Sequence, residues 1–185
     1  MKKKTIVIGV TGGIATYKAL EVISRLNYLG YETFVIMTKN AEEFVCPLSF
    51  ETLSKNPVAT NMFENKKTFE VEHIALAQKA DLFLIVPATA NIIGKVANGI
   101  ADDMLSTTII ATEAPVLFAL AMNEKMFENS IFQSNLSKLL YFGYSIVPPS
   151  AGVLACGDIG IGKLAKPDDI VKHVQYILER SEKNA

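Results

Sequence analysis

The sequence predicts an α/β fold: a single-domain, doubly wound sheet that is mostly parallel and has helices on both faces. Two observations carry this prediction. Apolar runs recur along the chain and are nearly continuous rather than alternating, as expected for strands that are covered on both faces. Segments with apolar residues at helical spacing lie between these runs, an order that is typical of parallel sheets. The runs span residues 5–10, 33–38, 82–88, 116–122 and 144–149.

The first apolar run leads into a glycine turn and then a helix. In "GVTGGIATYK", Gly12 and Gly13 precede a helix whose apolar positions run from Ala19 to Leu26, and Gly30 follows as a stop. Such a turn points backbone N–H groups and a helix N-terminus at an anion, which indicates phosphate binding. Plain packing of helix on strand explains the turn equally well. The spacing is neither that of a dinucleotide fingerprint nor that of a nucleotide P-loop.

Small and hydroxyl-bearing residues follow the second and third runs. Thr38 stands where a dinucleotide site usually has an acid for the ribose, so it fits a mononucleotide phosphate better. Ala88 and Thr89 permit close approach of a flat ligand, and Asn91 then opens a helix as a cap. A capped helix without any ligand is the alternative. Ligands of doubly wound sheets bind at the carboxyl ends of the strands, which makes these residues candidates.

Asn123 follows the fourth run directly, within "LAMNEKMF". Its side-chain NH2 can orient a carboxylate or an amide. Methionines at the spacing of Met126 fill the hydrophobic core more often than they contact a ligand. His73, beside Glu72 at the start of a helical segment, is read either as a cap or surface residue or as a base.

The last part of the chain combines glycines with a cysteine. Residues 150–166 hold Cys156 in a glycine-rich segment that is predicted to be a flexible loop. A helix over about 167–181 follows, with Pro167 in its first turn. No linker or repeat divides the chain, so residues 1–185 are expected to form one domain.

Composition and charge argue against several classes of function. Half of the residues are hydrophobic, which leaves room for a buried subunit interface, and a net charge of −1 gives no support to a nucleic-acid partner. No stretch approaches the ~20 apolar residues of a membrane span, and the start is too short for a signal peptide, so a cytoplasmic location is expected. Cys46 is expected to be buried, and the two cysteines and two histidines predict neither a disulfide framework nor a metal site.

Four motifs, in order, resemble those of the flavin-containing cysteine decarboxylases. "GVTGGIATYK" resembles the opening flavin loop of that family, "PATAN" its P-A-S-A-N-T motif and "LAMNEKMF" its P-x-M-N-x-x-M-W motif. "ACGDIGIGKLAKP" is similar to the substrate-clamp segment A-C-G-D-x-G-x-G-R-M-A-E-P. The resemblance covers essentially the whole chain and implies a Rossmann- or flavodoxin-like flavoprotein domain. The departures from the motifs are Thr89, Ile92, Leu120, Phe127, Lys163, Leu164 and Lys166.

The resemblance implies an FMN-dependent lyase that converts 4′-phosphopantothenoylcysteine to 4′-phosphopantetheine in coenzyme A biosynthesis. A cysteine-derived carboxylate has no neighbouring carbonyl to accept electrons, so oxidation to a thioaldehyde must precede loss of CO2. The resulting enethiolate is then reduced by the same flavin. By resemblance, His73 is the base of the oxidation, Asn123 holds the substrate carboxylate or amide, and Cys156 donates a proton to the enethiolate.

The resemblance also implies binding residues and an assembly. It places the FMN phosphate and ring along one set of residues and the substrate along another. The FMN set is Gly12, Gly13, Thr38, Ala88, Thr89, Asn91 and Ser106, and the substrate set is Asn123, Met126 and Lys163. It further implies a homotrimer or homododecamer with the site between subunits, and a separate synthetase enzyme upstream in the pathway.

Three alternatives stay open. A peptidyl-cysteine decarboxylase would share His73 and Asn123, but the nearly complete clamp motif favours the small phosphorylated substrate. A flavin prenyltransferase would share the fold and FMN, but resembling members lack the M-N motif and the cysteine clamp. A non-enzymatic flavoprotein that regulates a phosphatase is disfavoured because all three residues with catalytic roles are present.

Overall fold

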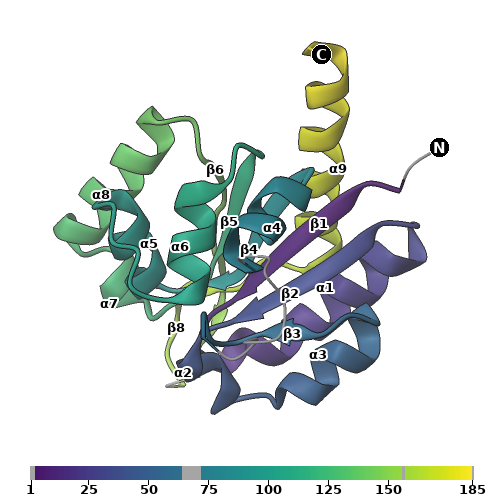
Figure 1. The fold of residues 1–185 in the computed structure, drawn as a ribbon. Coiled ribbons are helices and arrows are strands. Elements are labelled where there is room, and N and C mark those ends of the chain that lie inside the picture. Colours follow the sequence, from purple (N-terminus) through teal and green to yellow (C-terminus); the bar gives the residue numbers. More distant parts are fainter. Residues whose placement is uncertain (1–2, 64–71, 156, 185) are drawn as a thin grey trace.

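A six-stranded parallel sheet forms the centre of the structure, with helices on both of its faces (Figure 1). The computed structural model describes residues 3–63, 72–155 and 157–184. The strand order is β3-β2-β1-β4-β5-β6, and every neighbouring pair is parallel. The predicted doubly wound parallel sheet is therefore confirmed. Its strands are β1 (Thr5–Val10), β2 (Glu32–Met37), β3 (Val58–Ala59), β4 (Leu82–Ala88), β5 (Val116–Leu120) and β6 (Ser145–Val147).

The helices on the two faces bury two separate hydrophobic clusters. In β1, Ile6 and Ile8 belong to the first cluster, with α1, α3 and α9, whereas Val7 belongs to the second, with α5, α6 and α8. Because both faces are covered, the strands read as continuous apolar runs. The helices are η1 (Ile14–Thr16), α1 (Tyr17–Tyr28), α2 (Lys39–Glu42), α3 (Pro47–Ser54), α4 (Glu72–Lys79), α5 (Ala90–Ala97), α6 (Met104–Ala111), α7 (Glu124–Phe127), α8 (Ser130–Tyr141) and α9 (Pro167–Asn184).

Two strands end two residues earlier than the apolar runs predict. β5 stops at Leu120 because the chain then leaves the sheet: the N–H of Met122 donates to the carbonyl oxygen of Gly162 at 2.9 Å. β6 stops at Val147 because two prolines follow, and proline has no N–H to donate to a ladder. The short edge strand β3 has no clear pattern in the sequence, since two residues are too few to show a period.

The segment predicted as a loop over residues 150–166 contains regular secondary structure. Most of that segment is a two-stranded antiparallel ribbon, made of β7 (Ser150–Val153) and β8 (Ile159–Lys163). Two of its glycines allow close contact with the chain after β5. A Cβ on Gly160 would lie 2.5 Å from Oε1 of Glu124, and one on Gly162 would lie 2.1 Å from the carbonyl oxygen of Met122.

The described residues offer neither a helical membrane span nor a metal centre. None of their helices is both long and apolar enough to cross a bilayer. No group of three or more metal-ligating side chains is found among them. Cys46, which was expected to be buried, is exposed, because it is the N-cap residue of α3 at the surface.

Candidate active site

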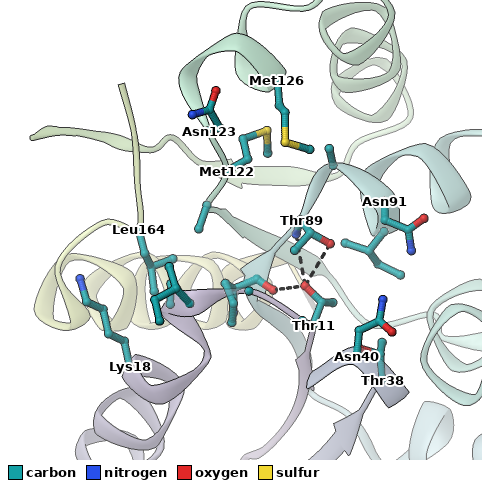
Figure 2. Close-up of a pocket in the computed structure, with 18 of the residues that line it drawn as sticks. Thr11, Lys18, Thr38, Asn40, Thr89, Asn91, Met122, Asn123, Met126 and Leu164 are labelled. Carbon is teal, nitrogen blue, oxygen red and sulfur yellow. Dashed lines mark hydrogen bonds between the residues drawn. The ribbon is translucent and has the colours of Figure 1, made fainter. Parts of the chain in front are cut away.

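A cavity of about 1000 Å³ lies at the carboxyl ends of the strands (Figure 2). The loops after β1, β2, β4 and β5 line it, together with the β7–β8 ribbon. β1 and β4 are neighbours, and the chain order reverses between them. Ligands of doubly wound sheets bind at such a switch point. The cavity is at the upper end of the ~300–1,000 Å³ that is usual for small-molecule sites.

The glycine turn after β1 packs against the start of α2. A Cβ on Gly12 would lie 2.5 Å from the Cβ of Asn40 and 2.6 Å from its carbonyl oxygen, so a larger residue would push this backbone away. A Cβ on Gly13 would meet only Thr89, at 3.8 Å. The N–H of Thr16 donates to the carbonyl oxygen of Gly13 at 2.9 Å and closes the turn. Both glycines border the cavity, and Gly12 is also required for packing.

Thr11 ties the loop after β1 to the loop after β4. Its hydroxyl donates to the carbonyl oxygen of Pro87 at 2.7 Å and lies 3.2 Å from the Thr89 hydroxyl, as Figure 2 shows. The N–H of Thr89 donates back to the Thr11 hydroxyl at 3.2 Å. Thr11 is only 2% exposed, so water does not compete for these partners. Sequence reasoning missed Thr11, although it stands between the first strand and the glycine turn.

Two threonines begin helices at the edge of the cavity. Thr38 is the N-cap of α2 and Thr89 is the N-cap of α5, and neither side chain caps its own helix. An anion in the cavity can therefore take the first N–H groups of these helices. Asn91, which was expected to be the cap, lies in the first turn of α5 and is exposed. Figure 2 shows Asn91, Asn40 and Thr38 on one side of the cavity.

Asn123 lies at another edge of the cavity, to one side of Met122 and Met126 (Figure 2). It is the N-cap of α7, where its Oδ1 accepts the N–H of Lys125 at 2.9 Å. Because the oxygen makes this capping bond, a ligand carboxylate would be bound by the side-chain NH2. Met126 is 48% exposed. Met126 therefore lines the cavity rather than filling the core.

Two lysines line the cavity. Lys18 comes from α1 and Lys163 from β8, and Figure 2 shows Lys18 beside Leu164. Partial burial lowers the pKa of Lys18, the charge of Lys163 lowers it further, and Glu21 acts in the opposite direction. Two ammonium groups that repel each other in this way are stabilised by an anion bound between them. Lys18 was missed from the sequence, where its only signal is its place just after the glycine turn.

A cluster of charges stands where α5 and α6 meet. Nζ of Lys95 lies 2.6 Å from a carboxylate oxygen of both Asp102 and Asp103. Burial opposes the charged form of Lys95, but the two carboxylates outweigh it and raise the lysine pKa. Asp103 also accepts the N–H of Ser106 at 2.8 Å and caps α6. Ser106 is fully buried in this cap and does not line the cavity.

The structure brings most of the predicted site residues together. Ala88 is fully buried in β4 and, like Ser106, lies outside the cavity lining. His73 is half-buried in the first turn of α4 and also lies outside the lining. Cys156 lies outside the described residues. The predicted residues that line the cavity are Gly12, Gly13, Thr38, Thr89, Asn91, Asn123, Met126 and Lys163.

Comparison with known proteins identifies relatives over nearly the full chain. A family model described as Flavoprotein matches residues 1–179. The coenzyme A biosynthesis bifunctional protein CoaBC of Borreliella burgdorferi is 47% identical over 92% of this chain, which spans 44% of that protein. A probable phosphopantothenoylcysteine decarboxylase of Streptococcus mutans is 45% identical over 93% of this chain and 97% of its own length. The chain thus spans less than half of the bifunctional relative and nearly all of the other.

Solved structures share the fold. A cysteine-to-serine mutant of PPC decarboxylase, complexed with pantothenoylaminoethenethiol, has a TM-score of 0.86 and 28% sequence identity over 96% of this chain and 100% of its own. The FMN-dependent cysteine decarboxylase SpaF has a TM-score of 0.85 and 29% identity over 97% of both chains. The fold is therefore shared with these two solved decarboxylase structures.

Proposed function

Because this chain belongs to the flavoprotein family, we propose that it binds FMN and decarboxylates 4′-phosphopantothenoylcysteine to 4′-phosphopantetheine. This reaction is a step of coenzyme A biosynthesis, and we expect it in the cytoplasm, with a synthetase as the supplier of the substrate. The resemblance to flavin-containing cysteine decarboxylases is confirmed. The observation that carries the proposal is that one cavity joins the glycine turn, Asn123 and Lys163.

The residues at the switch point fit FMN. Gly13 borders open space, and the first N–H groups of α2 and α5 have no side-chain cap from Thr38 or Thr89. These donors suit a phosphate, which we assign to Gly12, Gly13 and Thr38. We assign the flavin ring to the wall formed by Thr89 and Asn91. Bound FMN supplies the reversible two-electron oxidation and reduction of the carbon that carries the substrate sulfur.

Three side chains are assigned to the remaining steps. Asn123 holds the carboxylate that leaves as CO2. Its NH2 group is neutral, whereas a cationic group would stabilise the carboxylate and so oppose the release of CO2. His73 accepts the proton that is released when the CH2–SH group becomes a thioaldehyde. Cys156 gives a proton to the enethiolate that remains after CO2 has left.

The two lysines favour a phosphorylated substrate. Lys18 and Lys163 line the cavity. Figure 2 shows Lys18 on the side of the cavity opposite Thr38, the residue to which we assign the FMN phosphate. The lowered pKa of Lys18 reflects partial burial and the neighbouring charge, both of which a bound dianion would offset. A peptidyl-cysteine substrate, the second candidate, would bring no phosphate to these ammonium groups. A phosphatase-regulating role would use neither the lysines nor Asn123.

We propose that a second copy of the chain completes the site. His73 lies outside the cavity lining of its own chain, whereas Ile14 and Tyr17 at the cavity are 63% and 57% exposed. Exposed apolar side chains of this kind are suited to a subunit contact. In the expected homotrimer or homododecamer, His73 of one copy would meet the cavity of the next.

The test of the proposed function measures cofactor and product on the purified protein. We expect a yellow protein with an FMN spectrum, release of CO2, and 4′-phosphopantetheine detected by mass spectrometry. Pantothenoylcysteine, which lacks the phosphate, should have a KM raised at least tenfold, because one charge-assisted contact contributes about 1.5–3 kcal/mol. Colourless protein without turnover would overturn the proposal, and equal KM values would overturn the assignment of the lysines.

Replacement of Cys156 tests the proton donor. We expect Cys156→Ser to release CO2 but to accumulate the oxidised enethiol instead of 4′-phosphopantetheine, because a serine hydroxyl is a much weaker acid than a thiol. Mass spectrometry distinguishes the two products by two hydrogens. Full conversion to 4′-phosphopantetheine by this variant would contradict the assigned role.

Replacement of His73 tests the base. We expect His73→Asn to bind FMN but to lack the transient bleaching of FMN absorption that stopped-flow mixing with substrate, without oxygen, should reveal in the wild type, because the proton of the oxidation then has no acceptor. His173→Asn is the matched control, since His173 is exposed on α9 and its Nδ1 contacts the carbonyl oxygen of Asp169 at 2.8 Å. Equal bleaching in wild type and His73→Asn would leave His73 as a structural residue.

A further inference from the structure

Glu124 links the β7–β8 ribbon to the loop that carries Asn123. It is the first residue of α7, follows Asn123 directly and is half-buried. Its Oε1 accepts the N–H of Ile161, in β8, at 2.8 Å. One side chain therefore connects two parts of the cavity wall that are 37 residues apart in the chain.

The ribbon is shaped to receive this carboxylate. A Cβ on Gly160 would lie within 2.6 Å of both carboxylate oxygens of Glu124, so the carboxylate rests where any other residue would place a side chain. Two residues further along β8, Gly162 lies close to the backbone of Met122, and its carbonyl oxygen accepts the Met122 N–H at 2.9 Å. Backbone pairing and the Glu124 side chain thus act at adjacent points of β8.

The apolar side chains within the two strands of the ribbon are largely exposed, although the flanking Leu154 and Leu164 are buried. Val153 is 62% exposed, Ile159 is 81% exposed and Ile161 is 44% exposed. Since these side chains gain little from burial, polar contacts account for much of the attachment. Removal of one such contact should therefore shift the position of the ribbon measurably.

We propose that Glu124 is a positioning residue that docks the ribbon as a wall of the cavity and so holds Lys163 where the substrate phosphate binds. The part that concerns substrate rests on the proposed function, whereas the docking itself does not. Glu124 is not itself one of the residues that line the cavity, and it acts on Lys163 through β8.

Limited digestion with trypsin tests the docking on the FMN-loaded protein. Cleavage after Lys163 requires β8 to leave its place, and its rate follows the population of the open form. Glu124→Ala should raise this rate about tenfold, which corresponds to loss of about 1.4 kcal/mol. Glu124→Gln should stay within threefold of wild type, because its amide oxygen still accepts the Ile161 N–H. Mass spectrometry identifies the fragments.

The matched control is Glu128→Ala. Glu128 is another carboxylate at the end of α7, where it pairs with Lys125 at 3.6 Å and is exposed. Among the described residues, its side chain makes no hydrogen bond or ion pair with the ribbon. This variant should keep the wild-type cleavage rate. Equal acceleration of cleavage by Glu128→Ala and Glu124→Ala would mean that any weakening of α7 loosens the ribbon, and would overturn the proposal. A cleavage rate of Glu124→Ala within twofold of wild type would overturn it as well.

A change on the ribbon side supplies an independent test. Gly160→Ala places a methyl group where the carboxylate lies, so it should displace Glu124 and raise cleavage after Lys163. In Glu124→Ala, the same methyl group meets no carboxylate and should add less than twofold. If the double variant raises the cleavage rate by the product of the two single factors, the two changes act separately, which would contradict the proposal.

Kinetics connect the docking to the reaction. Glu124→Ala should raise the KM for 4′-phosphopantothenoylcysteine about tenfold, while the Kd for FMN stays within twofold, and Glu124→Gln should restore the KM. An equal loss of FMN affinity would indicate general damage rather than positioning. If the protein does not decarboxylate this substrate at all, the proposed function fails, but the digestion experiments still decide whether Glu124 docks the ribbon.

Discussion

At the scale of single residues, Thr11 shows how a buried hydroxyl organises the switch point. It joins the carbonyl oxygen of Pro87 and the N–H of Thr89 across two loops. Thr11→Val keeps the shape but leaves both groups without this partner, which should cost about 1–3 kcal/mol. We expect a fall in Tm of about 2–4 °C per kcal/mol and weaker binding of FMN. Calorimetry and FMN titration measure the two effects.

Thr52→Val is the control for this prediction. The Thr52 hydroxyl also donates to a backbone oxygen, that of Leu48 at 2.7 Å, but it is exposed. Water can replace the lost partner there, so stability should change by no more than about 0.5 kcal/mol. Equal effects at the two positions would show that the burial of Thr11 is not what makes its hydroxyl important.

At the scale of elements, α6 begins with a cap that also holds a charge pair. Asp103 accepts the N–H of Ser106 at 2.8 Å and lies 2.6 Å from Nζ of Lys95. Asp103→Ala removes the cap and should destabilise the fold by about 0.5–2 kcal/mol. Asp102→Ala is the control, because Asp102 makes the same contact with Lys95 without acting as the cap of α6. Urea denaturation at pH 7 compares the two variants.

The same cap predicts how stability depends on pH. Burial opposes ionisation of Asp103, but hydrogen bonds from Lys95 and Ser106 outweigh it and lower its pKa below the ordinary 3.8. A lowered carboxyl pKa adds stability above the ordinary value, and this contribution is lost as pH falls through the folded pKa. The stability gap between wild type and Asp103→Asn should therefore be constant from pH 7 to 5 and shrink below pH 3.8. A gap that widens in acid would contradict the assignment.

At the scale of the whole molecule, the proposed site needs more than one copy of the chain. We expect sedimentation equilibrium to give a mass three or twelve times the 20.2 kDa of one chain. Co-expressed His73→Asn and Cys156→Ser chains should form mixed assemblies in which some sites combine an intact His73 with an intact Cys156. Such assemblies should make 4′-phosphopantetheine although neither variant does so alone. A monomeric mass, or no product from the mixture, would contradict a shared site.

Much of the fold could be predicted because its determinants are local. The strands are covered on both faces, so their apolar runs are visible in the sequence, and β1 and β4 have the bounds of the runs at 5–10 and 82–88. The candidate site was predicted in the same way, since the loops at strand ends meet at one edge of a parallel sheet. Gly13, Thr38 and Asn123 accordingly line one cavity.

By itself, the sequence determined the order of strands and helices, the glycine turn and the motifs that identify the family, because each depends on neighbouring residues. Only the tertiary structure decided which distant groups meet. It brought Lys18 close to Lys163, buried Ser106 against the Asp103 cap of α6 and set Glu124 against Gly160. The glycines of β8 are the clearest case: locally they predict a loop, but they are needed because a carboxylate and a backbone from another part of the chain occupy the space of their missing side chains.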